Sequence, residues 1–204
     1  MRLESVTIKN VRSFKEETTV NFDDHFNILI GPNGSGKSNL LDIVNIALRE
    51  YILCTYVLET IQTEIGFVED VRREHNATAT IQSMLSKYSG DNSDMVIRFR
   101  LCITKDDVVN ITILKKQKDS ILSLFPKYRS VDGEISAYIN REFNFEEVVE
   151  GKIVEYSIHN YSLDYPQEGS IEQLYLSYLR AYRGLILLTR NSNIKLKPNI
   201  VFVS

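Results

Sequence analysis

Residues 31–38 read GPNGSGKS and match the pattern GxxxxGKS, in which each fixed position has a chemical reason. Gly34 and Gly36 let the main chain approach a bound anion closely and adopt conformations that a side chain would exclude. Lys37 directs a positive charge at phosphate, and the hydroxyl of Ser38 is a ligand that Mg²⁺ accepts. The stretch therefore predicts a site for a nucleoside triphosphate, ATP with Mg²⁺, at Gly31, Pro32, Asn33, Gly34, Ser35, Gly36, Lys37 and Ser38.

The sequence on both sides of this loop predicts the order strand, loop, helix that such a site requires. Residues 26–30, FNILI, form a short apolar run that ends at Gly31 and predict a buried strand. After Lys37, apolar residues return every three or four positions and predict an amphipathic helix that continues toward Gln62. Its predicted buried face carries Leu40, Leu41, Val44, Ala47, Leu48 and Tyr51.

Other segments predict further strands and one more helix. Alternation of apolar and polar residues predicts short strands near residues 6–9 and 19–22 and another over 152–159. Residues 170–173, SIEQ, have the form of a capping box and predict a helix of about three to four turns. The apolar run over 200–203 predicts a core strand.

A hairpin is predicted between the loop helix and the 152–159 strand. Residues 95–104 alternate between apolar and polar side chains, and so do residues 109–113. Residues 105–107, KDD, lie between them and have the composition of a turn. The pattern favours two antiparallel strands.

Composition limits the class of protein. The 204 residues are 43% hydrophobic and 25% charged, in the range of a globular chain that forms one domain or one large lobe. A formal net charge of -3 provides no global cationic field, so any nucleic-acid contact would have to be local. Residues 40–61 are interrupted by charges and do not predict a membrane span, and the amino terminus does not fit a secretory signal. We expect a cytoplasmic protein.

No metal-ligand spacing connects the cysteines and histidines. Cys54 and Cys102 are far apart in the sequence, which predicts buried free thiols rather than a disulfide or zinc site. His25, His75 and His159 are scattered, and we assign none of them a role.

The opening of the chain resembles a known family over about its first fifty residues. VTIKNVRSF at 6–14, a second strand, NILI at 27–30 and the run from Gly31 to Asp42 are similar to the amino-terminal lobe of ATP-binding-cassette ATPase heads of the RecF, OLD and structural-maintenance-of-chromosomes type. The resemblance implies roles in nucleotide binding for Asn33 and Asn39. It also implies that Arg12 lies close to the nucleotide; a solvated turn arginine is the other interpretation.

The family's second lobe carries a serine-glycine-glycine signature, a strand ending in Asp-Glu and a histidine switch, and we find no copy of these. FVED at 67–70 and YSGD at 88–91 are interpreted as loops. The family also places a glutamine near the magnesium and the attacking water, for which Gln117 and Gln167 are both candidates. The catalytic residues of hydrolysis are therefore unknown.

Basic residues gather after Glu172. Arg180, Arg183, Arg190, Lys195 and Lys197 occur there with Tyr175, Tyr178 and Tyr182. Such a group can grip a phosphate backbone and stack bases, which makes DNA a candidate partner. The alternative is a solvated helix face whose tyrosines pack into the core.

These observations predict an α/β fold: the phosphate-loop lobe of an ATP-binding-cassette-type head with an antiparallel β subdomain. We expect one lobe over 1–204, with a core at 1–62, an antiparallel region at 95–159, and a helix and terminal strand at 170–204. The expected function is ATP binding within a RecF-like or OLD-like ATPase in DNA repair or phage defence. Hydrolysis would then need a second lobe, a homodimer or a partner protein. The alternative is a nucleotide-binding regulatory module that does not hydrolyse.

Overall fold

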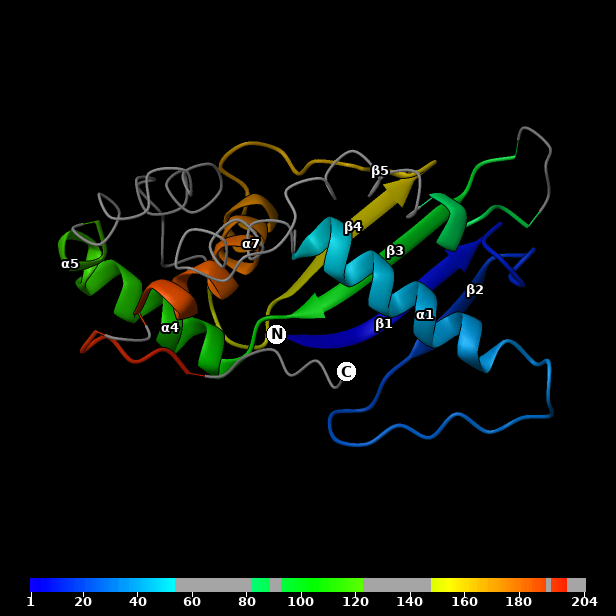
Figure 1. The fold of residues 1–204 in the computed structure, drawn as a ribbon, viewed down its shortest axis with the longest axis horizontal. Coiled ribbons are helices and arrows are strands. Elements are labelled where there is room, and N and C mark those ends of the chain that lie inside the picture. The colour runs from blue at the N-terminus through cyan, green and yellow to red at the C-terminus, as the bar shows by residue number, and fades with distance from the viewer. Residues whose placement is uncertain (54–81, 89–92, 123–147, 190–191, 198–204) are drawn as a thin grey trace, which may run out of the picture.

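The computed structural model describes residues 1–53, 82–88, 93–122, 148–189 and 192–197. Figure 1 shows a single sheet crossed on one face by α1 (Lys37–Ala47), with α4 (Lys105–Lys116), α5 (Lys118–Leu122) and α7 (Ile171–Thr189) gathered at one end of the sheet. Within those described ranges, no helix is long and apolar enough to cross a membrane. The α/β fold class predicted from the sequence is confirmed.

The sheet has five antiparallel strands in the order β2-β1-β3-β4-β5. These are β1 (Arg2–Lys9), β2 (Thr18–Asn21), β3 (Val96–Cys102), β4 (Ile153–His159) and β5 (Ser162–Leu163). The predicted strands near 6–9, 19–22, 95–104 and 152–159 are therefore confirmed. Because β3 lies between β1 and β4, the sheet joins the opening of the chain to residues about 150 positions later.

One face of the sheet is apolar because the alternation of each strand is in register with its neighbours. Val6 pairs with Val20 on one side and Phe99 on the other, and Phe99 pairs with Tyr156. This row joins the hydrophobic core that also contains Leu40 of α1. The opposite face is polar. Thr7 pairs with Thr19 on one side and with Arg98 on the other, and Arg98 pairs with Ser157. The hydroxyl oxygens of Thr7 and Thr19 are 2.8 Å apart.

The helix predicted after the loop is present, but its buried face is rotated from the predicted one. Leu40, Ile43 and Ala47 are its buried residues, whereas Leu41 is 57% exposed. The helix ends in a π-helical turn, η1 (Leu48–Ile52), closed by a hydrogen bond from Leu53 N to Leu48 O. Its predicted continuation over 54–62 lies outside the described residues.

The predicted buried strand at residues 26–30 is wrong. This segment has no strand partner in the described structure, and Phe26, Ile28 and Ile30 are 77%, 67% and 89% exposed. Leu29 alone of the four apolar residues packs against the core. FNILI is apolar at four of its five positions, as a buried strand is, but no strand of the described sheet pairs with it.

The predicted second strand of the hairpin, over 109–113, is also wrong, because these residues lie within α4. A capping box begins this helix: the side chain of Thr104 accepts from Asp107 N, and Asp107 accepts from Thr104 N. The buried positions Asp107, Asn110, Ile111 and Leu114 recur at three- and four-residue steps. The segment therefore carries both the two-residue period of a strand and the helical period. The capping box and the contacts with α7 select the helix.

The helix predicted from the capping box at 170–173 is confirmed and is longer than expected, since α7 runs from Ile171 to Thr189. Ser170 Oγ accepts from Gln173 N at 3.2 Å, and Gln173 Oε1 accepts from Gly169 N at 3.0 Å. Local side chains thus satisfy one N–H group in the first turn of α7, that of Gln173, and the N–H group of Gly169 just before the helix.

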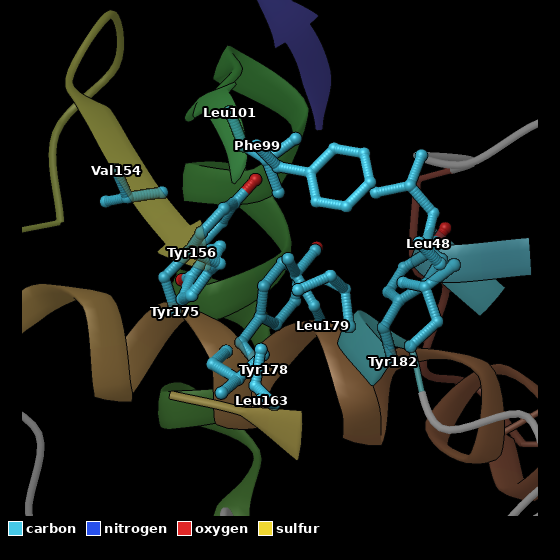
Figure 2. Packing of buried hydrophobic residues seen from close by; sticks show 14 of the residues in the cluster. Leu48, Phe99, Leu101, Val154, Tyr156, Leu163, Tyr175, Tyr178, Leu179 and Tyr182 are labelled. Atoms are coloured by element: carbon cyan, nitrogen blue, oxygen red, sulfur yellow. The ribbon is translucent and has the colours of Figure 1, made fainter. Parts of the chain in front are cut away.

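The tyrosines of α7 are core residues, so the hypothesis that they stack nucleic-acid bases is wrong. Tyr175 and Tyr178 are fully buried, Tyr182 is 2% exposed, and Figure 2 shows all three pointing into the cluster with Phe99 and Tyr156. Their hydroxyls bond inside the protein, Tyr175 to Asp107 and Tyr182 to a backbone carbonyl.

The basic residues around these tyrosines do not form one described patch. Arg180 is 3% exposed and donates to Tyr51 O and to the hydroxyl of Tyr165, whereas Lys195 and Lys197 are exposed. The side chains of Arg183 and Arg190, the segments 67–70 and 89–91 and the predicted strand at 200–203 lie outside the described residues.

Candidate phosphate-binding site

Residues 31–36 connect the exposed segment 26–30 to the first turn of α1. Gly34 and Gly36 have φ angles of 82° and 89°, in the left-handed region where glycine is favoured. A Cβ on Gly31 would stand 2.8 Å from Ser35 Oγ, and one on Gly36 would stand 3.1 Å from Ser13 Oγ. Side chains at these two positions would fill a cradle that glycine leaves open.

Backbone N–H groups at the start of α1 point out of the helix end. Ser35 N donates to Pro32 O and Leu40 N donates to Gly36 O, but among the described residues no acceptor faces the N–H groups of residues 36–39. The first turn of any helix leaves such donors, and they coincide with the positive end of the helix dipole. Four adjacent donors therefore converge where an anion would be stabilised.

Lys37 folds back over the loop. Its ammonium group donates to the carbonyl oxygens of Gly31 and Pro32 at 2.7 and 2.8 Å and to Ser35 Oγ at 3.3 Å. These three contacts hold the ammonium group against the loop. The lysine thus both shapes the cradle and supplies its positive charge.

Ser38 follows in the first turn of α1 and is exposed, so its hydroxyl is accessible beside the open N–H groups. A hydroxyl in this position fits Mg²⁺, which takes few protein oxygens and completes its shell with phosphate oxygens and water. The cradle, the four donors and this hydroxyl fit ATP with Mg²⁺. Asn33 is exposed at the turn of the loop.

The turn between β1 and β2 packs against the start of α1 and brings Arg12 and Asn39 together. Asn39 Nδ2 donates to Ser13 Oγ at 2.9 Å, and Asn39 Oδ1 accepts from Arg12 Nη1 at 3.4 Å. Arg12 Nη1 also forms an ion pair with Asp42 Oδ2 at 2.8 Å. Asn39 therefore fastens the turn to the helix, and the described side-chain contacts of Arg12 are to the helix rather than to the loop.

Ser13 and Asp42 belong to this site although sequence reasoning assigned neither of them a role. Ser13 lies against Gly36, and Asp42 is the carboxylate bonded to Arg12. Asp42 is four residues after Ser38 and three after Asn39, a spacing that would have indicated a shared helix face. The pairing across the β1–β2 turn had no sequence signal.

The two candidate glutamines are not brought to the loop by any described contact. Gln117 is the C-cap of α4, at the end of the sheet where α4, α5 and α7 gather, and Gln167 is exposed in the connection between β5 and α7. Within the described ranges, neither one forms a hydrogen bond with residues 31–38. The choice between them stays open.

Comparison with known proteins identifies similar sequences. A family model for the AAA ATPase domain matches residues 1–165. The chromosome partition protein Smc of Halobacteriovorax marinus is 48% identical over 42 residues, which cover 21% of this chain and 3% of that protein. The DNA replication and repair protein RecF of Lactobacillus johnsonii is 50% identical over 44 residues, covering 22% of this chain and 12% of RecF.

The DNA double-strand break repair Rad50 ATPase of Pyrococcus abyssi is 50% identical over 48 residues, which cover 24% of this chain and 5% of Rad50. The aligned part is thus a small fraction of each of these three relatives. No solved structure matches. The predicted resemblance to the RecF and structural-maintenance-of-chromosomes class is confirmed.

Proposed function

The chain belongs to the AAA ATPase domain family, and we propose that its residues 31–39 bind the phosphates of ATP with Mg²⁺. In this proposal they are the nucleotide-binding part of an ATPase that acts on DNA. One observation carries the proposal: the four N–H groups of residues 36–39 without a described acceptor belong to the same short loop and helix start as the ammonium group of Lys37, which bonds to Gly31 O and Pro32 O. Donors and charge in this arrangement favour a polyphosphate over a neutral ligand.

Each part of the site has a separate task. The N–H groups of 36–39 bind phosphate oxygens through the main chain, so they depend on glycine at 34 and 36. Lys37 neutralises phosphate charge, and its bonds to Gly31 and Pro32 hold it in place beforehand. Ser38 offers one oxygen to Mg²⁺, which when bound neutralises charge on the phosphates.

The exposed segment 26–30 supports the proposal that hydrolysis needs a further segment. Phe26, Ile28 and Ile30 alternate as a strand does, lead directly into the loop, and are more than half exposed. An exposed apolar segment that pairs with no strand of the described sheet favours association with another segment that would cover it. A second lobe or a partner chain that covers 26–30 would stand next to the phosphates, where a carboxylate and a water-orienting group are needed.

The biological role is proposed from the relatives. Smc, RecF and Rad50 are named for chromosome partition, DNA replication and repair, and DNA double-strand break repair. We assign this chain to ATP-dependent DNA repair. The resemblance to OLD ATPases makes phage defence the alternative role. A nucleotide-binding module that never hydrolyses is the second candidate, and the exposed edge at 26–30 favours it for this chain acting alone.

Calorimetric titration of the 204-residue chain with ATP, with and without Mg²⁺, tests the binding proposal, and phosphate release from the same sample tests turnover. We expect Mg²⁺-dependent binding and negligible turnover. Turnover of about one per second that Lys37→Ala abolishes would show that these residues already contain a complete catalytic site. No binding of ATP in either condition would overturn the proposed function itself.

A further inference from the structure

Arg12 is held on the second turn of α1, just below the phosphate-binding loop. Its guanidinium group contacts Asn39 Oδ1 at 3.4 Å and Asp42 Oδ2 at 2.8 Å. Asp42 is four residues after Ser38, so it lies one helical turn beyond the proposed Mg²⁺ ligand on the same side of α1. Arg12 thus brings a second cation to the first two turns of α1, the helix that begins at Lys37.

The backbone that carries Arg12 is fixed against the loop. Arg12 has a φ of 49°, which is uncommon outside glycine, and its N–H donates to Ser86 O at 2.8 Å. Val11 and Phe14 form an isolated β-bridge across the turn, and Ser13 Oγ stands 3.1 Å from the position of a Cβ on Gly36. These contacts hold the backbone of the turn, so a change of partner by Arg12 would involve its side chain.

We propose that Asp42 competes with bound phosphate for the guanidinium of Arg12, an inference that rests on the nucleotide site proposed above. The side chains of Arg12 and Asp42 are 22% and 56% exposed, so water screens their ion pair and it is weak. A guanidinium bonded to a phosphate in a cradle of N–H donors forms stronger, charge-assisted bonds. ATP therefore draws Arg12 from Asp42 to the loop, and the ion pair lowers the affinity for ATP by the strength of its own contact.

The competition predicts that removal of the carboxylate tightens binding of ATP. Asp42→Asn keeps the size of the side chain and weakens its hold on Arg12. We expect the dissociation constant for ATP with Mg²⁺ to fall about 2- to 5-fold, which is the range of an exposed ion pair. A matched control is Asp106→Asn, which removes an exposed charge in the first turn of α4, at the opposite end of the sheet from the start of α1.

Removal of any negative charge near a bound anion also strengthens binding, so the decisive test is a double-mutant cycle. Asp42→Asn is measured in the unsubstituted chain and again in Arg12→Gln and Arg12→Ala backgrounds, by calorimetry with ATP and Mg²⁺. Thermal melting verifies that each variant is folded. We expect the gain from Asp42→Asn to vanish when Arg12 is absent.

Two results overturn the inference. If Asp42→Asn leaves the affinity unchanged or weakens it while the unsubstituted chain binds ATP, the ion pair does not compete with phosphate. If the gain is equal with and without Arg12, the carboxylate acts only as a nearby charge. A chain that binds no ATP at all would overturn the proposed function as well, which separates the two failures.

Discussion

The ammonium group of Lys37 donates a 2.7 Å hydrogen bond to the carbonyl oxygen of Gly31, six residues earlier in the chain. This bond, together with the one to Pro32 O, ties the first turn of α1 to the beginning of the loop. Lys37 therefore holds the loop closed, in addition to its proposed role in binding phosphate.

Replacement of Lys37 should change the affinity for ATP much more than the free energy of unfolding. Lys37→Ala should weaken binding of ATP about 10- to 100-fold, since a hydrogen bond to a charged group contributes ~1.5 to 3 kcal/mol. The free energy of unfolding should change by less than about 0.5 kcal/mol because the contacts of this side chain are exposed. Calorimetry and urea denaturation measure the two effects, with Lys9→Ala at the exposed end of β1 as the matched control. Unchanged affinity in Lys37→Ala would contradict the role given to its ammonium group.

Ser38→Ala should affect the part of binding that depends on Mg²⁺. The hydroxyl is exposed beside the open N–H groups and is the proposed protein ligand of the ion. We expect affinity for ATP to drop when Mg²⁺ is present and to change little when it is chelated. Equal losses in the two titrations would remove Ser38 from the set of metal ligands.

The two glycines of the loop with positive φ should differ in their response to alanine. Nothing lies within 4 Å of a Cβ on Gly34, so Gly34→Ala should cost only the left-handed backbone, about 1–2 kcal/mol. Gly36→Ala carries the same backbone cost plus a 3.1 Å contact with Ser13 Oγ, and it should be more destabilising. Urea denaturation compares them, and a double-mutant cycle of Ser13→Gly with Gly36→Ala separates the steric part from the loss of the bond between Asn39 and Ser13. An identical cost for the two alanine variants would show that the Ser13 contact is relieved without strain.

The exposed apolar segment should cause the isolated chain to self-associate. Ile28 is 67% exposed between two other exposed apolar residues, so Ile28→Glu should reduce association without loss of stability. Light scattering after size-exclusion chromatography measures the mass, and Thr19→Glu on the exposed edge strand β2 is the control. Association that persists in Ile28→Glu would place the interface elsewhere.

Three tyrosines should make the fold sensitive to alkaline pH. Burial raises the pKa of Tyr51 to about 12 and raises the pKa values of Tyr156 and Tyr175 well above 10, and the nearby carboxylate of Asp107 adds to the effect on Tyr175. The unfolded chain loses these protons near pH 10 while the folded chain keeps them. Stability should therefore be complete below pH 10 and fall as the pH rises above it, by about 1.4 kcal/mol per pH unit for each tyrosine that ionises only when unfolded.

Urea denaturation between pH 9 and 12 measures this alkaline slope. Tyr175→Phe has no proton to retain at that position, so its stability should fall less steeply with pH than that of the unsubstituted chain. Parallel slopes for the two proteins would show that Tyr175 ionises equally in the folded and unfolded states.

Much of the site and part of the fold could be predicted from local sequence. Gly36, Lys37 and the following apolar spacing predicted the start of α1, and period-two alternation predicted β1, β3 and β4, because turn, cap and strand preferences act over a few residues. At residues 109–113 local alternation did not decide the structure. Their alternation suited a strand, but Thr104 and Asp107 cap a helix there, and Asn110 bonds with the hydroxyl of Tyr178 on α7.

The proposed phosphate-binding loop could be predicted from local sequence, because the left-handed glycines, the lysine and the helix start all lie within eight adjacent residues. What surrounds that loop depends on packing between distant elements. Residues 26–30 have the pattern of a strand, yet pairing depends on a neighbour elsewhere in the chain or in another chain, and the described sheet provides none. The ion pair of Arg12 with Asp42 joins residues thirty positions apart, and it exists because the β1–β2 turn folds onto α1. Such contacts arise from packing between elements, which no spacing along the chain encodes.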